Sequence, residues 1–225
     1  MKIYVASANA ADIRWAVDNG LADGVLTRPA EMFEAGEDTT TDANGHATLA
    51  EICRIARLPV LASVSSVSSA EIYRDGRELA KVSDLVHVQI PLVEDAVSAI
   101  GRLRADGVRV VATLVYSAAQ AVLAAKAGAF MVGVSVDQLD LYGHDGADAV
   151  RDIASVFSAH AAECDVLASL PQHAAQFARC ARSGADVIAV TPQVLRSLLV
   201  HPLTDRGLDQ WLRDLSSHHR TRATA

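Results

Sequence analysis

Residues 84–91 read DLVHVQIP and place His87 and Gln89 two positions apart in an otherwise apolar run that ends at Pro91. Side chains alternate along a strand, so this spacing puts the imidazole and the amide on the same face. A histidine with a pKa near ~6.5 suits general acid/base catalysis, whereas an amide only donates or accepts hydrogen bonds. The run predicts a strand ending at a polar site, with His87 in proton transfer. The alternative is that His87 is a hydrogen-bonded group of the core.

Other polar residues end similar apolar runs. Ser135 and Asp137 share a face at the end of FMVGVSV, where Asp137 could orient His87, act as the base itself, or only cap a loop. Arg28 follows DGVLT, and a guanidinium pairs with a carboxylate or phosphate in a fixed fork. We therefore predict an anion clamp at Arg28, with an exposed rim charge as the alternative. Hydroxyls expected to bind the ligand come from Ser63, Thr113, Ser135 and Ser169.

Several other chemistries lack their usual sequence pattern. Nothing like GxSxG surrounds the serines, so we predict that they are not nucleophiles. His87, Asp137 and His144 could together hold a metal ion, but they lack tight ligand spacing. No GxGxxG follows the first apolar run, which disfavours a dinucleotide fold. We therefore expect no metal and no cofactor.

Short apolar runs alternate with longer amphipathic segments along the whole chain. In EDAVSAIGRLRADG, for example, Ala96, Ile100 and Leu103 recur at helical spacing and Gly107 is expected to stop the helix. The apolar runs are continuous, as in strands covered on both faces. The predicted strands are 2–6, 23–27, 59–63, 84–90, 109–115, 130–136, 165–169 and 186–190.

Eight strand–helix units in 225 residues predict one α/β domain over residues 1–225, a closed (β/α)8 TIM barrel. A doubly wound open sheet is the alternative. In such barrels the chemistry sits at the carboxyl ends of the strands, where the polar residues above are found. The long polar stretch 36–48 is expected to be an exposed loop, with a flap over the site as the alternative.

Composition excludes some partners. The net charge is −7, and Lys/Arg clusters only in the C-terminal HHRTR, so we expect no nucleic acid. No apolar run approaches the roughly 18 residues of a membrane span, and MKIYVASANA lacks the apolar segment of a signal peptide. The three cysteines have no metal spacing and are expected to be buried thiols in a reducing cytoplasm.

Several motifs resemble the transaldolase family, in particular its fructose-6-phosphate aldolase-like branch. GVLTRPAEM (24–32) is similar to that family's GVTTNPS segment, and VVATLVYSAAQAVLAAKAGA (110–129) matches with Thr113 in place. VSVDQLDLYGHDG (134–146) keeps the family's loop spacing, and DQWLRDLSSHHRTR resembles its terminal helix. The resemblance implies the barrel fold. It also implies a homo-oligomer, a decamer or pentamer, in which a helix at about 204–218 packs on a neighbouring subunit.

The resemblance also implies where the chain departs from the family. Members form a Schiff base between a ketone donor and a strand-four lysine in a K-V-P context, which here reads Gln89-Ile90-Pro91. An amide nitrogen is neither basic nor nucleophilic, so Gln89 forms no iminium ion. Other family positions read Ala6 for aspartate, Arg28 for asparagine and Ser63 for glutamine. The phosphate-gripping cations are replaced at Gln138 and in Ser169-Leu170-Pro171.

Two functions remain open. The first is an enzyme of specialised metabolism that handles a small anionic carbonyl compound by acid/base chemistry: aldol-type bond formation or cleavage, cyclisation or isomerisation. His87, Asp137 and Gln89 would carry the catalysis, and Arg28, Ser63, Thr113, Ser135 and Ser169 the binding. The second is a catalytically silent barrel that binds a small ligand or a partner. Because the replacements are polar and not apolar, we favour the enzyme.

Overall fold

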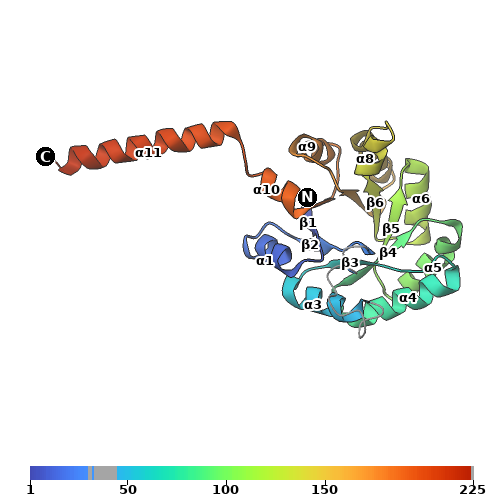
Figure 1. Ribbon diagram of the computed structural model, residues 1–225. Helices are drawn as coiled ribbons and strands as arrows, with labels where there is room; N and C mark the ends of the chain where they lie inside the picture. The colour runs from blue at the N-terminus through green and yellow to red at the C-terminus, as the bar shows by residue number, and fades with distance from the viewer. Residues whose placement is uncertain (30–31, 33–44, 224–225) are drawn as a thin grey trace.

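A computed structural model describes residues 1–29, 32 and 45–223 of the chain. Eight strands form one closed, wholly parallel barrel in sequence order, with β8 paired to β1 (Figure 1). The strands are β1 (Lys2–Ala6), β2 (Gly24–Leu26), β3 (Val60–Ser63), β4 (Val86–Pro91), β5 (Val110–Val115), β6 (Met131–Ser135), β7 (Asp165–Ser169) and β8 (Val187–Val190).

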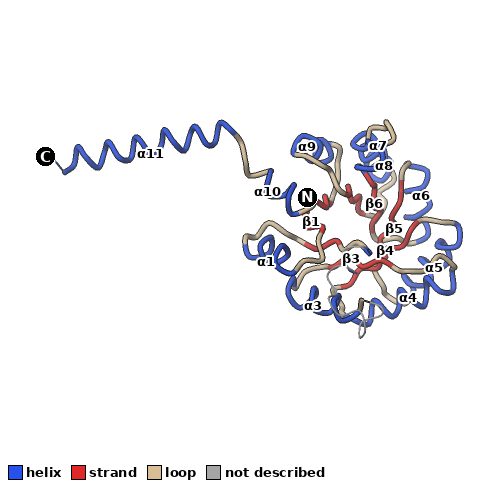
Figure 2. The backbone as a smooth tube through the Cα atoms, in the orientation of Figure 1, coloured by secondary structure: helices blue, strands red, loops and turns tan. Residues whose placement is uncertain are grey.

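The described helices lie outside this ring of strands, and all but α11 pack around it (Figure 2). They are α1 (Ala10–Asp18), α3 (His46–Ala56), α4 (Ser69–Val82), α5 (Glu94–Ala105), α6 (Ala118–Ala127), α7 (Val136–Leu141), α8 (Gly146–Ala159), α9 (Ala174–Arg182), α10 (Pro192–Ser197) and α11 (Pro202–Ala223). The TIM barrel predicted from the alternating pattern is therefore confirmed, and the open sheet is excluded by the closure between β1 and β8.

Apolar side chains form two separate layers. The barrel interior holds a compact cluster that includes Tyr4, Leu61 and Met131, and a larger cluster fills the space between strands and helices. Val86, Val88 and Ile90 belong to the outer cluster, as the alternation in DLVHVQIP predicts. The intervening His87 and Gln89 are 3% and 5% exposed, so both are buried on the inner side of the sheet.

Some predicted boundaries were wrong. The sixth predicted strand extends through Val136, but β6 ends at Ser135 and α7 begins at Val136. Asp137 therefore lies in the first turn of a helix and does not alternate with Ser135 along a strand. Within the polar stretch 36–48, residues 46–48 belong to α3 and residues 36–44 lie outside the described residues, so a loop or flap there stays a prediction.

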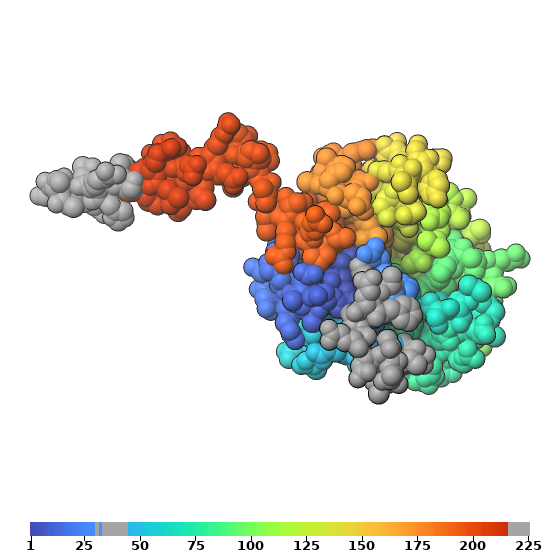
Figure 3. All heavy atoms as spheres, in the orientation of Figure 1, coloured from blue at the N-terminus to red at the C-terminus, as the bar shows by residue number. Residues whose placement is uncertain are grey.

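The terminal helix α11 is longer than predicted and stands clear of the barrel (Figure 3). Leu208, Trp211, Leu212 and Leu215 recur at helical spacing, and each is 40–59% exposed. Among the described residues, no helix is long and apolar enough to cross a membrane.

Candidate functional site

An amide network joins the ends of three neighbouring strands. Gln89 Nε2 donates to the Thr27 carbonyl oxygen at 3.0 Å and to Ser63 Oγ at 3.3 Å. Thr27 Oγ1 in turn donates to the Leu61 carbonyl oxygen at 2.7 Å. Gln89 sits opposite Ser63 in the β3–β4 register, which explains why the two side chains meet. In both of these hydrogen bonds the amide nitrogen is the donor, and the Gln89 oxygen accepts no hydrogen bond from any described residue.

Three further hydroxyls lie at the carboxyl ends of β5, β6 and β7. Ser135 and Ser169 are the last residues of their strands and are paired in register. Thr113 lies opposite Pro91, where β5 becomes irregular before Leu114 at φ 56°. All three residues are half-buried, and their hydroxyls have no hydrogen bond to a described residue. Half-buried hydroxyls without protein partners are suited to bind a polar ligand.

Asp137 adds a carboxylate two residues beyond the end of β6. Its Oδ1 is buried and has no hydrogen-bond partner among the described residues, while Oδ2 is 3.5 Å from Gln138 Nε2. A desolvated carboxylate oxygen without a donor is costly to the fold, so such a group calls for an explanation. Proton transfer is the chemistry that a carboxylate in this position can perform.

Apolar residues complete the same end of the barrel. Leu170 follows Ser169 with a left-handed φ of 60° and packs against the interior cluster. Its backbone N–H donates to the Ala189 carbonyl oxygen at 2.8 Å, which fixes this unusual conformation. Ala6, buried at the end of β1, belongs to the same cluster. Apolar side chains at the end of β1 and just after β7 thus lie at the same end of the barrel as the polar groups.

His87 lies on the inner face as predicted, but its contacts lie toward the amino end of the barrel. Its Nε2 is 3.2 Å from Nη1 of Arg109, the residue before β5, and its ring packs edge-on against Phe130 at 5.5 Å between centroids. An arginine only donates, so Nε2 accepts and the ring proton is assigned to Nδ1, which is buried without a partner among the described residues. Burial, followed by the charges of Arg109 and Lys2, lowers the pKa of His87 to about 4.

The structure therefore separates the three predicted catalytic residues. Gln89 lies near the carboxyl end of β4 and Asp137 just beyond that of β6, whereas His87 is closer to the amino end and has no hydrogen bond to either. Its role in catalysis stays a prediction. Arg28 lies exposed just after β2, at the carboxyl end where an anion clamp was predicted.

Every lysine of the chain lies away from the carboxyl ends of the strands. Lys2 begins β1 and pairs with Asp165 at 3.9 Å, at the amino end of the barrel. Lys81 lies in α4 and Lys126 in α6, as predicted. Since these three are the only lysines in the sequence, no amine is available at the carboxyl ends to form an iminium ion.

The cysteines, His144 and Asp140 lie outside this set of strand-end groups. The three cysteines are free and buried, which confirms the prediction of buried thiols, and burial raises the pKa of Cys164 to about 12. His144 is exposed on the loop after α7. Asp140 accepts from the Gly146 N–H at 2.7 Å and from Gln176, so it braces the segment between α7 and α9. No group of three possible metal ligands occurs among the described residues.

Sequence reasoning overlooked two residues. Leu170 reaches the barrel interior only because its φ is positive, and no residue type signals that conformation in a leucine. Arg109 contacts His87 because β4 and β5 pair as Val88 with Val110, which places the preceding residues side by side. That contact requires the strand register, which the sequence pattern leaves open.

The fold and this set of groups define the class of protein: a (β/α)8 barrel with its candidate site at the carboxyl ends of the strands. Residues 11–224 match the family model described as Transaldolase/Fructose-6-phosphate aldolase. The chain belongs to this transaldolase/fructose-6-phosphate aldolase family.

Individual relatives agree with that assignment. The chain is 35% identical over 214 residues to a protein of Bacillus cereus named "Probable transaldolase 1", covering 95% of this chain and 97% of the relative. It is 37% identical over 214 residues to a "Probable transaldolase" of Hyphomonas neptunium, with 95% and 96% covered. A "Probable transaldolase" of Caulobacter vibrioides is 36% identical over 217 residues, with 96% and 97% covered.

Proposed function

We propose that this chain is an enzyme that has exchanged the iminium chemistry of its family for acid/base chemistry on a small anionic carbonyl compound. One observation carries the proposal: the carboxyl ends of the strands hold a carboxylate oxygen and three hydroxyls without hydrogen-bond partners among the described residues, and no lysine. An abandoned site would be expected to fill with apolar side chains or with polar groups that satisfy one another.

The residues suit proton abstraction next to a carbonyl group. The bond between hydrogen and the α-carbon breaks, the proton passes to Asp137, and the electron pair moves to the carbonyl oxygen. Hydroxyls of Thr113, Ser135 and Ser169 would stabilise that oxyanion as donors. The enolate carbon then attacks a second carbonyl carbon in an aldol addition, or takes a proton at another position in an isomerisation. Cleavage is the reverse of the aldol addition, and cyclisation is the same addition within one molecule.

The wall around the site indicates the kind of substrate. Arg28 is the cation that we place at the mouth, and a guanidinium pairs well with a single carboxylate. Leu170, which is only partly buried, supplies apolar surface beside the polar groups, where a short carbon chain would fit. We therefore propose a small carboxylate that carries a ketone or aldehyde, in preference to a sugar phosphate. The three free, buried thiols agree with a reducing cytoplasm.

Deuterium exchange tests this proposal without knowledge of the full reaction. Small oxo-carboxylates such as pyruvate, 2-oxobutanoate and levulinate are incubated with the protein in deuterated buffer, and loss of the α-proton signal is followed by NMR. We expect catalysed exchange with at least one of them. Absence of exchange across the panel, combined with measurable binding, would favour the second function below.

A ligand-binding barrel without catalysis is the second candidate. Gln89 is already engaged through its amide nitrogen, and Ala6 leaves β1 without a titratable group at the site. Both features suit binding better than chemistry. In that case a bound compound would be recovered unchanged after long incubation, and the Asp137→Asn variant would alter affinity alone.

The absence of an amine at the site predicts that the protein forms no Schiff base. Incubation with dihydroxyacetone and borohydride should leave the intact mass unchanged. Gln89→Lys is the matched positive control, because it restores an amine between Thr27 and Ser63. With Ala6 in place of a carboxylate, we expect this variant to trap some donor yet show at most trace aldolase activity. A stable adduct on Lys2, Lys81 or Lys126 of the wild type would contradict the prediction.

We also propose a homo-oligomer, a decamer or pentamer by family resemblance, held together in part by α11. A helix that stands clear of the body while exposing Leu208, Trp211, Leu212 and Leu215 requires a partner, since most helical stability comes from packing an apolar face. Light scattering should give a multiple of 23.7 kDa. Trp211→Asp should shift the mass toward the monomer, whereas Arg14→Asp on exposed α1 should not. A monomeric wild type at micromolar concentration would refute the proposal.

A further inference from the structure

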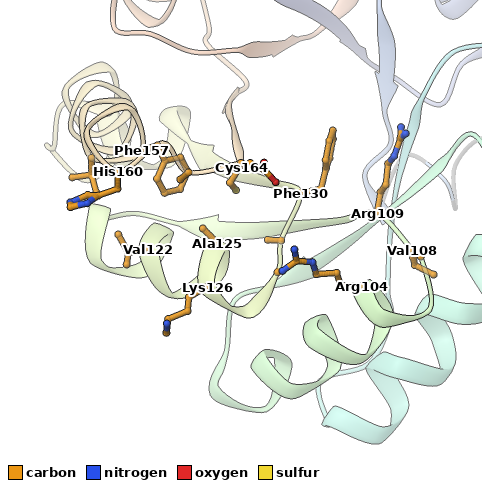
Figure 4. Close-up of a pocket in the computed structure, with 16 residues that line it drawn as sticks. Arg104, Val108, Arg109, Val122, Ala125, Lys126, Phe130, Phe157, His160 and Cys164 are labelled. Carbon is orange, nitrogen blue, oxygen red and sulfur yellow. The ribbon is translucent and has the colours of Figure 1, made fainter.

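A groove lies at the opposite end of the barrel from the candidate active site. Arg109, Phe130 and Cys164, which line it, each directly precede a strand, β5, β6 and β7 respectively. The cavity measures about 740 Å³, within the range of roughly 300–1,000 Å³ of small-molecule pockets. It is closed on its other sides by α6, the end of α5 and α8 (Figure 4).

The walls of this groove are largely apolar. Phe157, Cys164 and Phe130 lie in a row along one side, and Val122 and Ala125 of α6 lie across from them (Figure 4). Burial keeps the Cys164 thiol protonated, because it raises its pKa to about 12. The row therefore presents uncharged surface that an apolar body can contact.

Two arginines flank the same surface. Arg104 extends from the end of α5 toward α6, and Arg109 stands beside Phe130 (Figure 4). The Arg104 stem lies over Gly128, where an added Cβ would come within 2.4 Å of Arg104 Cδ, so that position accommodates the stem only as glycine. Lys126 and His160 also line the groove, but their polar ends point away from the phenyl rings.

Among the described residues, the partners of Arg109 are uncharged. Its Nη1 donates to His87 Nε2, and its guanidinium carbon lies 5.4 Å from the centre of the Phe130 ring. His87 is neutral at pH 7, because its pKa is lowered to about 4. Neither Arg109 nor Arg104 forms an ion pair with a described carboxylate. The guanidinium is thus held in place while no described carboxylate pairs with its positive charge, which favours an external anion.

We propose that this groove binds an organic anion with an apolar body, whose carboxylate or phosphate contacts Arg104 while its body packs on Phe130 and Phe157 and the positive charge of Arg109 beside Phe130 attracts the anion. The site is separate from the strand-end groups and does not depend on the function proposed for them. Glu163 is the one acidic residue lining the groove, so anions are favoured over cations there.

Calorimetry with 1-naphthyl phosphate tests the proposal. We expect a dissociation constant between about 10 µM and 1 mM, the range for a ligand of this size. Inorganic phosphate lacks the apolar body and uncharged 1-naphthalenemethanol lacks the anionic group. Each should therefore bind about 10-fold more weakly or worse. Failure of the naphthyl phosphate to bind below about 5 mM would overturn the proposal.

Substitutions of residues that line the groove test whether 1-naphthyl phosphate binds there. Arg104→Gln should weaken binding about 10-fold or more, Arg109→Gln should weaken it by a smaller factor, and Ala125→Trp should abolish it by filling the groove. Arg102→Gln is the matched control, because Arg102 also lies on α5 but stacks on Tyr73 at 3.6 Å, outside the groove. Unchanged affinity in Ala125→Trp would show that the probe binds elsewhere, including on exposed α11, and would refute the assignment. A thermal melt of each variant shows whether it is folded.

Discussion

Asp137→Asn is expected to lower the rate of α-proton exchange by about 10²–10⁴-fold, the usual contribution of a general base. The variant keeps the size and most of the polarity of the side chain but removes its ability to take a proton. Stability should hold or rise slightly, because Oδ1 is a buried charged oxygen without a partner among the described residues. The measurement is the exchange rate by NMR, paired with a urea unfolding curve at the same pH.

Asp95→Asn provides the matched control for this experiment. Like Asp137, Asp95 lies in the first turn of a helix that follows a barrel strand, but it is exposed on α5. The Asp95→Asn variant should therefore catalyse α-proton exchange of the substrate at the wild-type rate. An Asp137→Asn variant that is folded and fully active would remove Asp137 from the chemistry and leave the hydroxyls as binding groups alone.

The second large effect concerns His87 and stability below neutral pH. Its pKa is lowered from 6.5 to about 4 in the folded protein, mainly by burial. Between these values the unfolded chain holds more protons on His87 than the folded chain does. The folded protein therefore keeps its full stability with respect to His87 above pH 6.5, and its free energy of unfolding decreases as the pH falls toward 4. At pH 4.5 we expect the loss to reach about 2–3 kcal/mol.

Urea unfolding of the wild type and His87→Asn at a series of pH values measures this contribution. The difference in unfolding free energy between the two proteins should shrink as the pH falls, while exposed His144→Asn should track the wild type throughout. A pH-independent difference would mean that His87 titrates normally in the fold. Turnover at pH 7.5 tests whether His87 also takes part in catalysis. A loss of about 10²-fold or more in folded His87→Asn would establish His87 as a catalytic group.

Much of the fold could be predicted because it depends on local patterns. Continuous apolar runs of strand length, separated by amphipathic segments, are what a parallel sheet covered by helices requires. The alternation in DLVHVQIP correctly assigned Val86, Val88 and Ile90 to the outer layer and His87 and Gln89 to the inner face. Strand ends were predicted less well: Val136 continues an apolar run yet begins α7, because residue type alone does not fix where the backbone turns.

The candidate site was predictable only as a set of positions. The sequence by itself determined that eight strands would bring Ser63, Gln89, Thr113, Ser135 and Ser169 to one end of a barrel, and that no lysine would join them. Only the tertiary structure decided which of these groups satisfy one another. Gln89 meets Ser63 and His87 meets Arg109 because of the strand register, which is set by packing across many residues. The left-handed turn at Leu170 and the groove beside Arg109 arise in the same way, from chain segments far apart in sequence that meet only when the barrel closes.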